Sequence, residues 1–97
     1  MFKAIAIQLK EDISNPSSCV DISMIKIQTN NKSGTWLLPK KLVYGLVKEG
    51  VEIVVCNPNV TNRPSLICAE SSTGELYVRS EPNDIKSDNL LMLPRIK

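Results

Sequence analysis

The excess of isoleucine and valine is the feature that most constrains how this chain folds. These two residue types together number 18, against 10 leucines and 3 alanines. β-Branched side chains lose rotamer freedom in a helix and fit the pleated, half-buried surface of a sheet. We therefore expect strands to dominate. The 97 residues fit one domain, since compact domains usually contain about 50 to 200 residues.

Apolar runs separated by turn-forming residues predict six strands. Asn, Ser and Gly between the second and third runs, and Ser, Thr and Gly between the last two, favour hairpin turns, since Asn and Gly tolerate positive φ. The expected strands cover residues 2–9, 20–29, 35–38, 51–56, 65–70 and 75–80.

One helix is expected to begin at Pro39, which ends the third strand because its ring excludes the preceding residue from the α region. An apolar stripe runs from Leu42 to Val47, and Gly50 lies at the position that commonly ends a helix. Gly45 costs about 1 kcal/mol relative to alanine inside a helix. It indicates either a close approach of this helix face to the sheet or simple tolerance of glycine.

The element order βββαβββ predicts an α+β fold, in which a mostly antiparallel sheet of about six strands carries one packed helix. The segment after residue 80 begins with polar residues and ends with mostly apolar ones, from Leu90 to Ile96. We expect this tail to pack on the sheet edge or on a neighbouring subunit. Because apolar residues make up only 42% of the chain, the core should be thin, which favours a homo-oligomer.

The sequence contains no histidine, the commonest general base and metal ligand. This absence excludes Ser-His-Asp and Cys-His catalysis and histidine-containing zinc sites. Cys19, Cys56 and Cys68 form no C-x-x-C pair and are too few for a four-thiolate site. We therefore expect no catalysis, no metal and no other cofactor.

Charge and hydropathy give further expectations about location and partners. No apolar run approaches the roughly 18 residues that a membrane span needs, and Lys10 follows the first apolar run too soon for a secretory signal. We expect a cytoplasmic protein that does not contact membranes. A net charge of +2 with scattered lysines and arginines disfavours nucleic-acid binding.

Tyr77 and Arg79 are the first residues that suggest a ligand site. They share one face of the last strand because side chains two residues apart point the same way, and Leu76 and Val78 should then face the core. A tyrosine ring can stack on a base, and a guanidinium can bind a phosphate with two hydrogen bonds. The alternative is an ordinary amphipathic strand in which Arg79 pairs with a carboxylate of the tail.

Asp84, Asp88 and Asn89 form the densest group of oxygen-bearing side chains. The group lacks the alternating carboxylates and central glycine of a calcium loop, so we expect no metal there. These residues could read hydroxyl or base groups of a ligand. The alternative is that they form turns and caps that organise the tail.

Trp36, Lys40 and Lys41 have open interpretations as well. Trp36 either packs in the core or at its rim, or serves as a ligand platform or interface anchor. Lys40 and Lys41, with Lys32 in the preceding turn, form either a solvated basic face or an anion site at the helix N-terminus.

Two segments near the C-terminus carry a family resemblance. Residues 76–84, Leu-Tyr-Val-Arg-Ser-Glu-Pro-Asn-Asp, and residues 88–94, Asp-Asn-Leu-Leu-Met-Leu-Pro, resemble the closing signature of domain of unknown function 3892. This small bacterial and phage family has a Tyr-x-Arg-Thr strand before Asp-Asn-Leu-Leu-x-Leu-Pro. Here Ser80 stands where threonine is usual, and residues 57–64 form a polar insert. The resemblance implies a fold family and supplies no activity.

Our leading functional hypothesis is a non-catalytic protein that binds a small anionic, nucleotide-like molecule of the cyclic-nucleotide or ADP-ribose type. Tyr77 would stack on the base, Arg79 would contact phosphate, and the three polar residues of the tail would read hydroxyl or base groups. The occurrence of the family in phages suggests that such a protein sequesters a host signalling nucleotide. The alternative is a protein-interaction module or an inhibitor of a host protein, using Trp36, the helix face and the tail.

Overall fold

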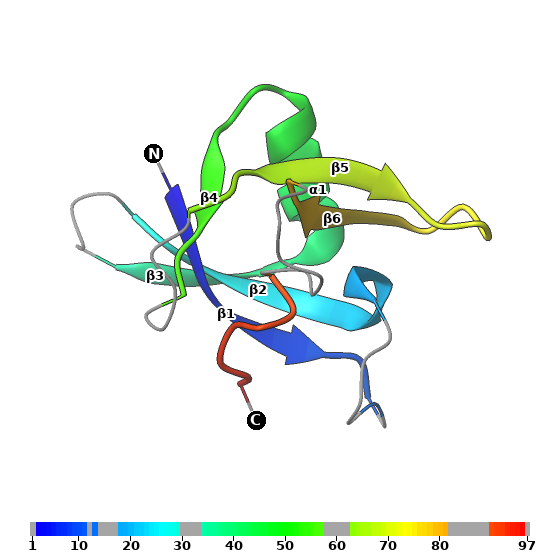
Figure 1. Cartoon of the computed structure of the whole chain (residues 1–97), viewed down its shortest axis with the longest axis horizontal. Helices are drawn as coiled ribbons and strands as arrows, with labels where there is room; N and C mark the ends of the chain where they lie inside the picture. Colours follow the sequence, from blue (N-terminus) through cyan, green and yellow to red (C-terminus); the bar gives the residue numbers. More distant parts are fainter. Residues whose placement is uncertain are drawn as a thin grey trace.

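The protein is described by a computed structural model that covers residues 2–11, 13, 18–29, 34–57, 63–81 and 90–96. Within these residues the chain forms six strands, one α-helix and one short 3-10 helix (Figure 1). The α+β class expected from the sequence is confirmed. The elements are β1 (Phe2–Leu9), η1 (Cys19–Asp21), β2 (Ile22–Gln28), β3 (Thr35–Pro39), α1 (Lys40–Lys48), β4 (Ile53–Val55), β5 (Leu66–Glu70) and β6 (Leu76–Ser80).

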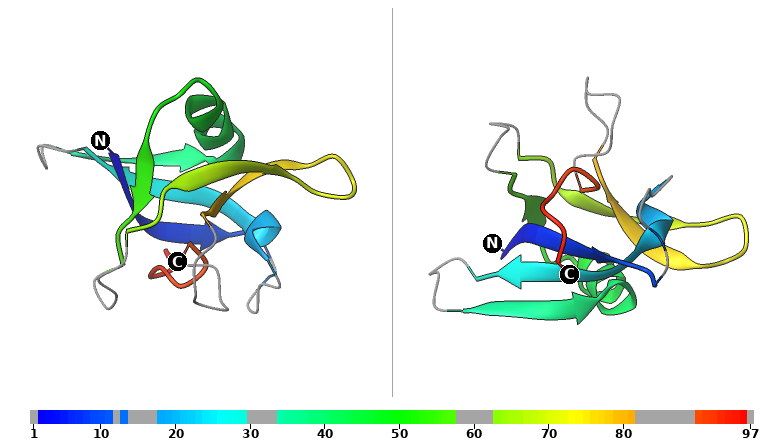
Figure 2. Two further views of the ribbon diagram at one scale, coloured as in Figure 1. Left: turned by 45° about the horizontal axis from the view of Figure 1, so that its top comes forward. Right: turned by 90° about the horizontal axis from the view of Figure 1, so that it is seen from below.

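The strands are divided between two sheets, where the sequence suggested one. Four strands form a sheet in the order β3-β2-β1-β4, and β5 pairs with β6 in a separate hairpin. All pairings are antiparallel except that of β1 with β4. Among the described residues, an isolated bridge between Val54 and Ser65 joins the two sheets. β5 then leaves the plane of the first sheet, and the hairpin extends beyond it beside α1 (Figure 2).

β1 contains irregularities that the alternating pattern did not predict. Its register against β2 shifts between Ala4 and Ala6 and again between Gln8 and Leu9. Ala4 and Ile7 are both fully buried although they are three residues apart. In a regular strand such residues point to opposite faces, so the first bulge turns both toward the core.

The helix starts one residue later than expected. Pro39 is the last residue of β3 and the N-cap of α1, with an extended backbone (φ −62°, ψ 147°). Gly50 follows the helix at φ +98°, in the region that glycine adopts without strain. A Cβ atom placed on Gly45 would meet no atom within 4 Å. Of the two interpretations of Gly45, the structure supports tolerance and not close approach.

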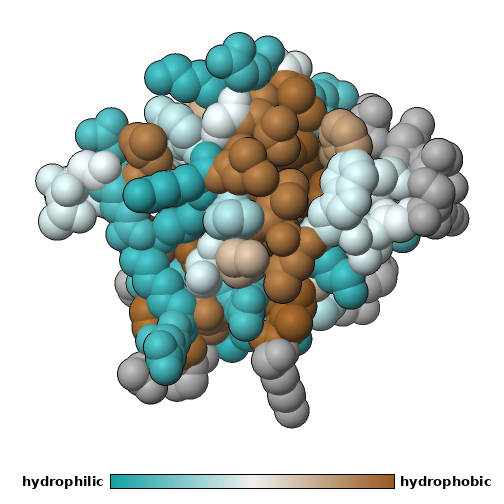
Figure 3. Space-filling view, turned by 180° about the vertical axis from the view of Figure 1, so that it is seen from behind, coloured by the Kyte–Doolittle hydropathy of each residue, from teal (hydrophilic) through white to brown (hydrophobic). Residues whose placement is uncertain are grey.

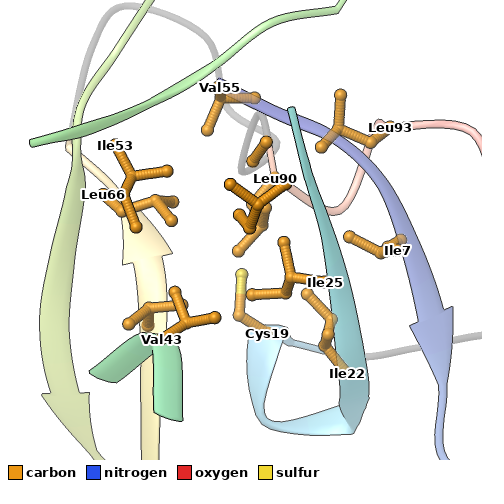
Figure 4. Packing of buried hydrophobic residues seen from close by; sticks show 13 residues of the cluster. Ile7, Cys19, Ile22, Ile25, Val43, Ile53, Val55, Leu66, Leu90 and Leu93 are labelled. Carbon is orange, nitrogen blue, oxygen red and sulfur yellow. The ribbon is translucent and has the colours of Figure 1, made fainter. Parts of the chain in front are cut away.

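The hydrophobic core lies between the inner face of the four-stranded sheet, the β5–β6 hairpin, α1 and the C-terminal tail. Figure 4 shows side chains from all of these elements converging. The residues labelled there are Ile7, Cys19, Ile22, Ile25, Val43, Ile53, Val55, Leu66, Leu90 and Leu93.

The C-terminal tail packs on the sheet of its own chain. Leu90 and Leu93 are 0% and 2% exposed. The backbone N–H of Ile7 donates to the Pro94 carbonyl at 2.9 Å, and that of Ile96 donates to the Ile7 carbonyl at 2.7 Å. The buried Asn57 side chain donates to the Met92 carbonyl at 3.3 Å. Of the two expected positions for the tail, the sheet edge is therefore confirmed.

Candidate functional site

The β5–β6 hairpin presents Tyr77 and Arg79 on its outer face. Val78, between them, is 1% exposed and pairs with Cys68, whose thiol donates to the Tyr44 carbonyl of α1 at 3.5 Å. One face of the hairpin therefore packs on the helix. Tyr77 and Arg79 lie on the other face, because strand side chains alternate.

The surroundings of these two residues differ. Arg79 is exposed, whereas Tyr77 is half-buried and packs against the core cluster. Their cross-strand neighbours are Ile67 and Ala69, which are also half-buried. The result is a mostly apolar strip with Arg79 at one end. The other predicted site residues, Asp84, Asp88 and Asn89, lie outside the described residues.

A cluster of three charged side chains, which we call the Glu75 cluster, joins the hairpin to the rest of the protein. Nζ of Lys10 donates to Glu75 Oε1 at 2.9 Å and lies 2.8 Å from Oε2. Nζ of Lys40 also pairs with Glu75 Oε2 and donates to the Val20 carbonyl at 2.7 Å. The Glu75 carboxylate, in the turn before β6, thus links the residue after β1 to the first residue of α1. Through its hydrogen bond to the Val20 carbonyl, Lys40 also links α1 to η1.

The hairpin turn sets the position of Glu75. Its backbone N–H donates to Ser71 Oγ at 2.9 Å, and its carbonyl accepts from the Ser71 N–H at 2.9 Å. Gly74 precedes it at φ +86°, which lets the chain reverse without strain. The carboxylate is therefore anchored from its own backbone before it meets the two lysines.

Proton affinities in the Glu75 cluster follow from its geometry. Hydrogen bonds from Lys10 and Lys40 lower the pKa of Glu75 from 4.5 to about 2. Hydrogen bonding to Glu75 raises the pKa of Lys10. Burial lowers the pKa of Lys40, because desolvation of its ammonium outweighs the attraction of the carboxylate.

The position of Lys40 corrects the sequence-based expectation. Neither a solvated helix face nor an anion site describes it, since the residue is only 7% exposed and its ammonium is directed at Glu75 and the Val20 carbonyl. Lys41 is exposed, as expected. Lys10 and Lys40 are 65 and 35 residues from Glu75, so no local sequence pattern could have revealed the cluster. Its groups satisfy one another, which gives it a structural role.

A third feature is an apolar surface on β3 and the first turn of α1. Trp36, Leu37 and Leu42 are 51%, 43% and 49% exposed, and we call them the β3–α1 surface. Figure 3 shows apolar side chains gathered in a band on the face where these elements lie. The Trp36 ring lies 6.1 Å from the Phe2 ring, at a tilt of 46°. Trp36 is therefore a rim residue, supported from one side and open to solvent on the other.

Two negative findings apply to the described part of the chain. No group of three or more cysteine, aspartate or glutamate side chains there is arranged to hold a metal ion. Within the same residues, no helix combines the length and the hydropathy required to cross a bilayer.

Comparison with known proteins gives one match. A family model described as "Protein of unknown function (DUF3892)" matches residues 5–94. No curated protein and no solved structure matches the chain. The matched region includes all of α1, β2 to β6 and most of the tail. It also contains both segments near the C-terminus that suggested the resemblance, and the chain therefore belongs to the DUF3892 family.

Proposed function

We propose that the protein is a non-catalytic protein-interaction module that binds its partner through the β3–α1 surface. The observation that carries this proposal is the half-exposure of three large apolar side chains, Trp36, Leu37 and Leu42, on one edge strand and the helix that follows it. Trp36 and Leu37 lie on opposite faces of β3, so apolar side chains border its free edge from both sides. An unpaired strand edge of this kind is a template for association with another chain. Tryptophan is also among the residues that contribute most to binding energy at interfaces.

Within the described residues, the Glu75 cluster favours binding over catalysis. An acid–base or nucleophilic residue must be free to reach a substrate. Lys40 is the buried group whose lowered pKa would suit such a role, but its ammonium is directed at Glu75 and the Val20 carbonyl. The Glu75 cluster therefore stabilises the fold.

Site-specific photocrosslinking tests the proposal. The photoreactive residue p-benzoylphenylalanine is introduced at Leu37 in one variant and at Met92 in another, and both are irradiated in the producing cell. Leu37 and Met92 are each 43% exposed, so the second variant controls for exposure alone. We expect a discrete protein adduct from position 37 only. Equal adducts from both positions, or none from position 37, would refute the proposal.

A second candidate function is the binding of a small anionic, nucleotide-like ligand of the cyclic-nucleotide or ADP-ribose type. The exposed Arg79 beside the half-buried Tyr77 favours it, and Asp84, Asp88 and Asn89 would complete the site. The biological use of such a site would be the sequestration of a host signalling nucleotide by a phage-type protein.

Thermal shift against a panel of mono-, di- and cyclic nucleotides tests this second function. A ligand at a hundred times its Kd adds about 2.7 kcal/mol of stability, which raises the Tm of a domain this small by several degrees. Arg79→Ala should abolish the shift, whereas Lys41→Ala, at an exposed lysine on the helix, should preserve it. The absence of a shift with every nucleotide would contradict the ligand hypothesis.

A further inference from the structure

The outer edge of β3 presents unpaired backbone groups in a defined pattern. β3 is the terminal strand of its sheet. Thr29 and Gly34 stand opposite one another, one step beyond the Gln28 and Thr35 pair, and the Thr29 N–H donates to the Gly34 carbonyl at 3.3 Å. Hydrogen-bonded and non-bonded pairs alternate along an antiparallel ladder. Residues 36 and 38 therefore bond to β2, and residues 35, 37 and 39 direct their backbone groups outward.

Proline fits this assignment. Pro39 has no N–H, and a proline is accommodated in an edge strand when its nitrogen faces away from the neighbouring strand. Because position 39 points outward, its missing donor removes no bond to β2. The Pro39 carbonyl remains available to accept a hydrogen bond at that end of the free edge.

The chain covers the opposite edge of the same sheet with its own segments. The Val55 N–H of β4 donates to the Pro64 carbonyl at 2.8 Å. Beyond β4, the tail bonds to both backbone groups of Ile7, through Pro94 and Ile96. In the part of the chain that the structure describes, no such segment bonds to the outer edge of β3.

We infer that a second copy of this chain occupies the β3–α1 surface, with the two β3 strands paired antiparallel about a twofold axis at Leu37. This inference rests on the interaction surface of the proposed function and names its occupant. The Leu37 N–H of each copy donates to the Leu37 carbonyl of the other. The Thr35 N–H of each copy donates to the Pro39 carbonyl of the other. The pairing therefore forms four backbone hydrogen bonds, and it is the register that overlaps all five residues of the strand.

The side chains of β3 are complementary to themselves in this register. Trp36 and Leu38 lie on the inner face, because they pair with the buried Ile27 and Ile25 of β2. Across the twofold axis, Trp36 of one copy stands opposite Leu38 of the other, and this pair occurs twice. Leu37 meets Leu37 of the second copy on the outer face. Aromatic and aliphatic cross-strand pairs of this kind stabilise sheets.

Charge does not oppose the pairing. β3 has the sequence Thr-Trp-Leu-Leu-Pro and carries no charged side chain, so the twofold axis brings no like charges together within the strand. Charged side chains are one of the devices that keep edge strands apart, and β3 lacks them. Proline is another such device, but Pro39 is the last residue of β3 and its carbonyl still accepts a hydrogen bond in this register. Stable interfaces bury about 800 Å² per partner. Three half-exposed side chains and one short strand edge bury less area than this. We therefore expect a Kd in the micromolar range, about 1 to 100 μM.

Placing opposite charges at Leu37 in two separate variants tests both the dimer and its register. Leu37→Glu and Leu37→Lys are prepared separately, and each puts like charges opposite one another across the axis. Each variant alone should self-associate at least about tenfold more weakly than the wild type, and an equimolar mixture should recover a heterodimer. Sedimentation velocity from about 1 μM to about 1 mM measures both effects. Because Leu37 points away from the core, circular dichroism should show both variants folded.

A matched control and an optical readout complete the test. Met92→Glu, at a residue exposed to the same 43% as Leu37, should dimerise like the wild type. Trp36 is the single tryptophan of the chain, so its emission should shift to shorter wavelength as concentration rises. A wild type that stays monomeric throughout, or folded charge variants that associate like the wild type, would overturn the inference. A mixture that fails to recover the heterodimer would also overturn it.

The crosslinking experiment separates this inference from the proposed function. An adduct at position 37 with twice the mass of the chain supports both. An adduct with a different protein only, together with a monomeric purified chain, supports the proposed function and refutes the second copy as partner. No adduct specific to position 37 refutes the proposed function, and sedimentation then judges the dimer by itself.

Discussion

Replacing Glu75 with glutamine should destabilise this protein more than its position in a surface turn suggests. The substitution keeps the size of the side chain and removes its charge. Lys40, whose side chain is 9% exposed, then keeps its ammonium and its bond to the Val20 carbonyl and loses its counter-charge. The perturbation therefore leaves a buried cation without a counter-charge.

The magnitude follows from how deeply the pair is buried. Removing one partner of a fully buried ion pair costs about 3 to 5 kcal/mol, whereas exposed pairs contribute about 0 to 1 kcal/mol. The Glu75 side chain is 29% exposed, between these limits, so we expect a loss of about 2 kcal/mol. For a domain of this length that lowers the Tm by about 8 to 16 °C.

Two matched substitutions show whether the buried lysine is the cause. Lys10→Met breaks the more exposed pair, at 37% exposure of the lysine side chain, and should cost less than about 1 kcal/mol. Lys40→Met removes the buried charge and retains an apolar chain, and Glu75 keeps Lys10 as a partner. It should cost less than Glu75→Gln, because no buried charge is left unpaired.

Acid provides an independent readout. The lysines lower the pKa of Glu75 from 4.5 to about 2, so its stabilising effect is fully present above pH 4.5 and is lost as the pH falls through about 2. Urea denaturation of the wild type and Glu75→Gln should therefore give curves that are furthest apart near neutral pH and converge in acid. A Glu75→Gln variant no less stable than Lys10→Met, or a difference independent of pH, would refute the reasoning.

The remaining predictions concern the backbone and the tail. Gly45→Ala should stabilise the protein by about 0.5 to 1 kcal/mol, because the new methyl group meets no atom within 4 Å. Gly50→Ala should destabilise it by about 1 kcal/mol, because φ is +98° there; equal effects in urea denaturation would contradict this helix boundary. Leu93→Ala should cost about 2 to 4 kcal/mol and Met92→Ala little. Similar losses would contradict the packing of the tail.

Local patterns predicted the elements well because local physics determines them. Alternation of apolar residues placed β1 at residues 2–9, as the structure has it. Glycine at position 50 marked the end of the helix, because few other residues adopt positive φ without strain. Pro39 located the change from strand to helix within one residue. Each of these depends on the chain within a few positions of the residue concerned.

The candidate sites could be predicted only in part. The exposure of Arg79 followed from strand alternation. The half-burial of Tyr77 did not, because it depends on which segments of the chain cover the outer face of the hairpin. The sequence left open whether Trp36 packs in the core, packs at its rim or serves as a ligand platform or interface anchor. The structure placed it at an exposed rim. The edge position of β3 depends on the order of strands in the sheet, which local patterns do not specify.

The sequence by itself determined the α+β class, the absence of histidine chemistry and the approximate bounds of every strand and the helix. Only the tertiary structure decided that the strands divide into two sheets, that a bulge turns Ala4 and Ile7 to the same side, and that Lys40 is buried beside Glu75. The reason is the range of the interactions involved. Backbone and side-chain preferences act between near neighbours, whereas sheet order and buried charge pairs join residues many positions apart.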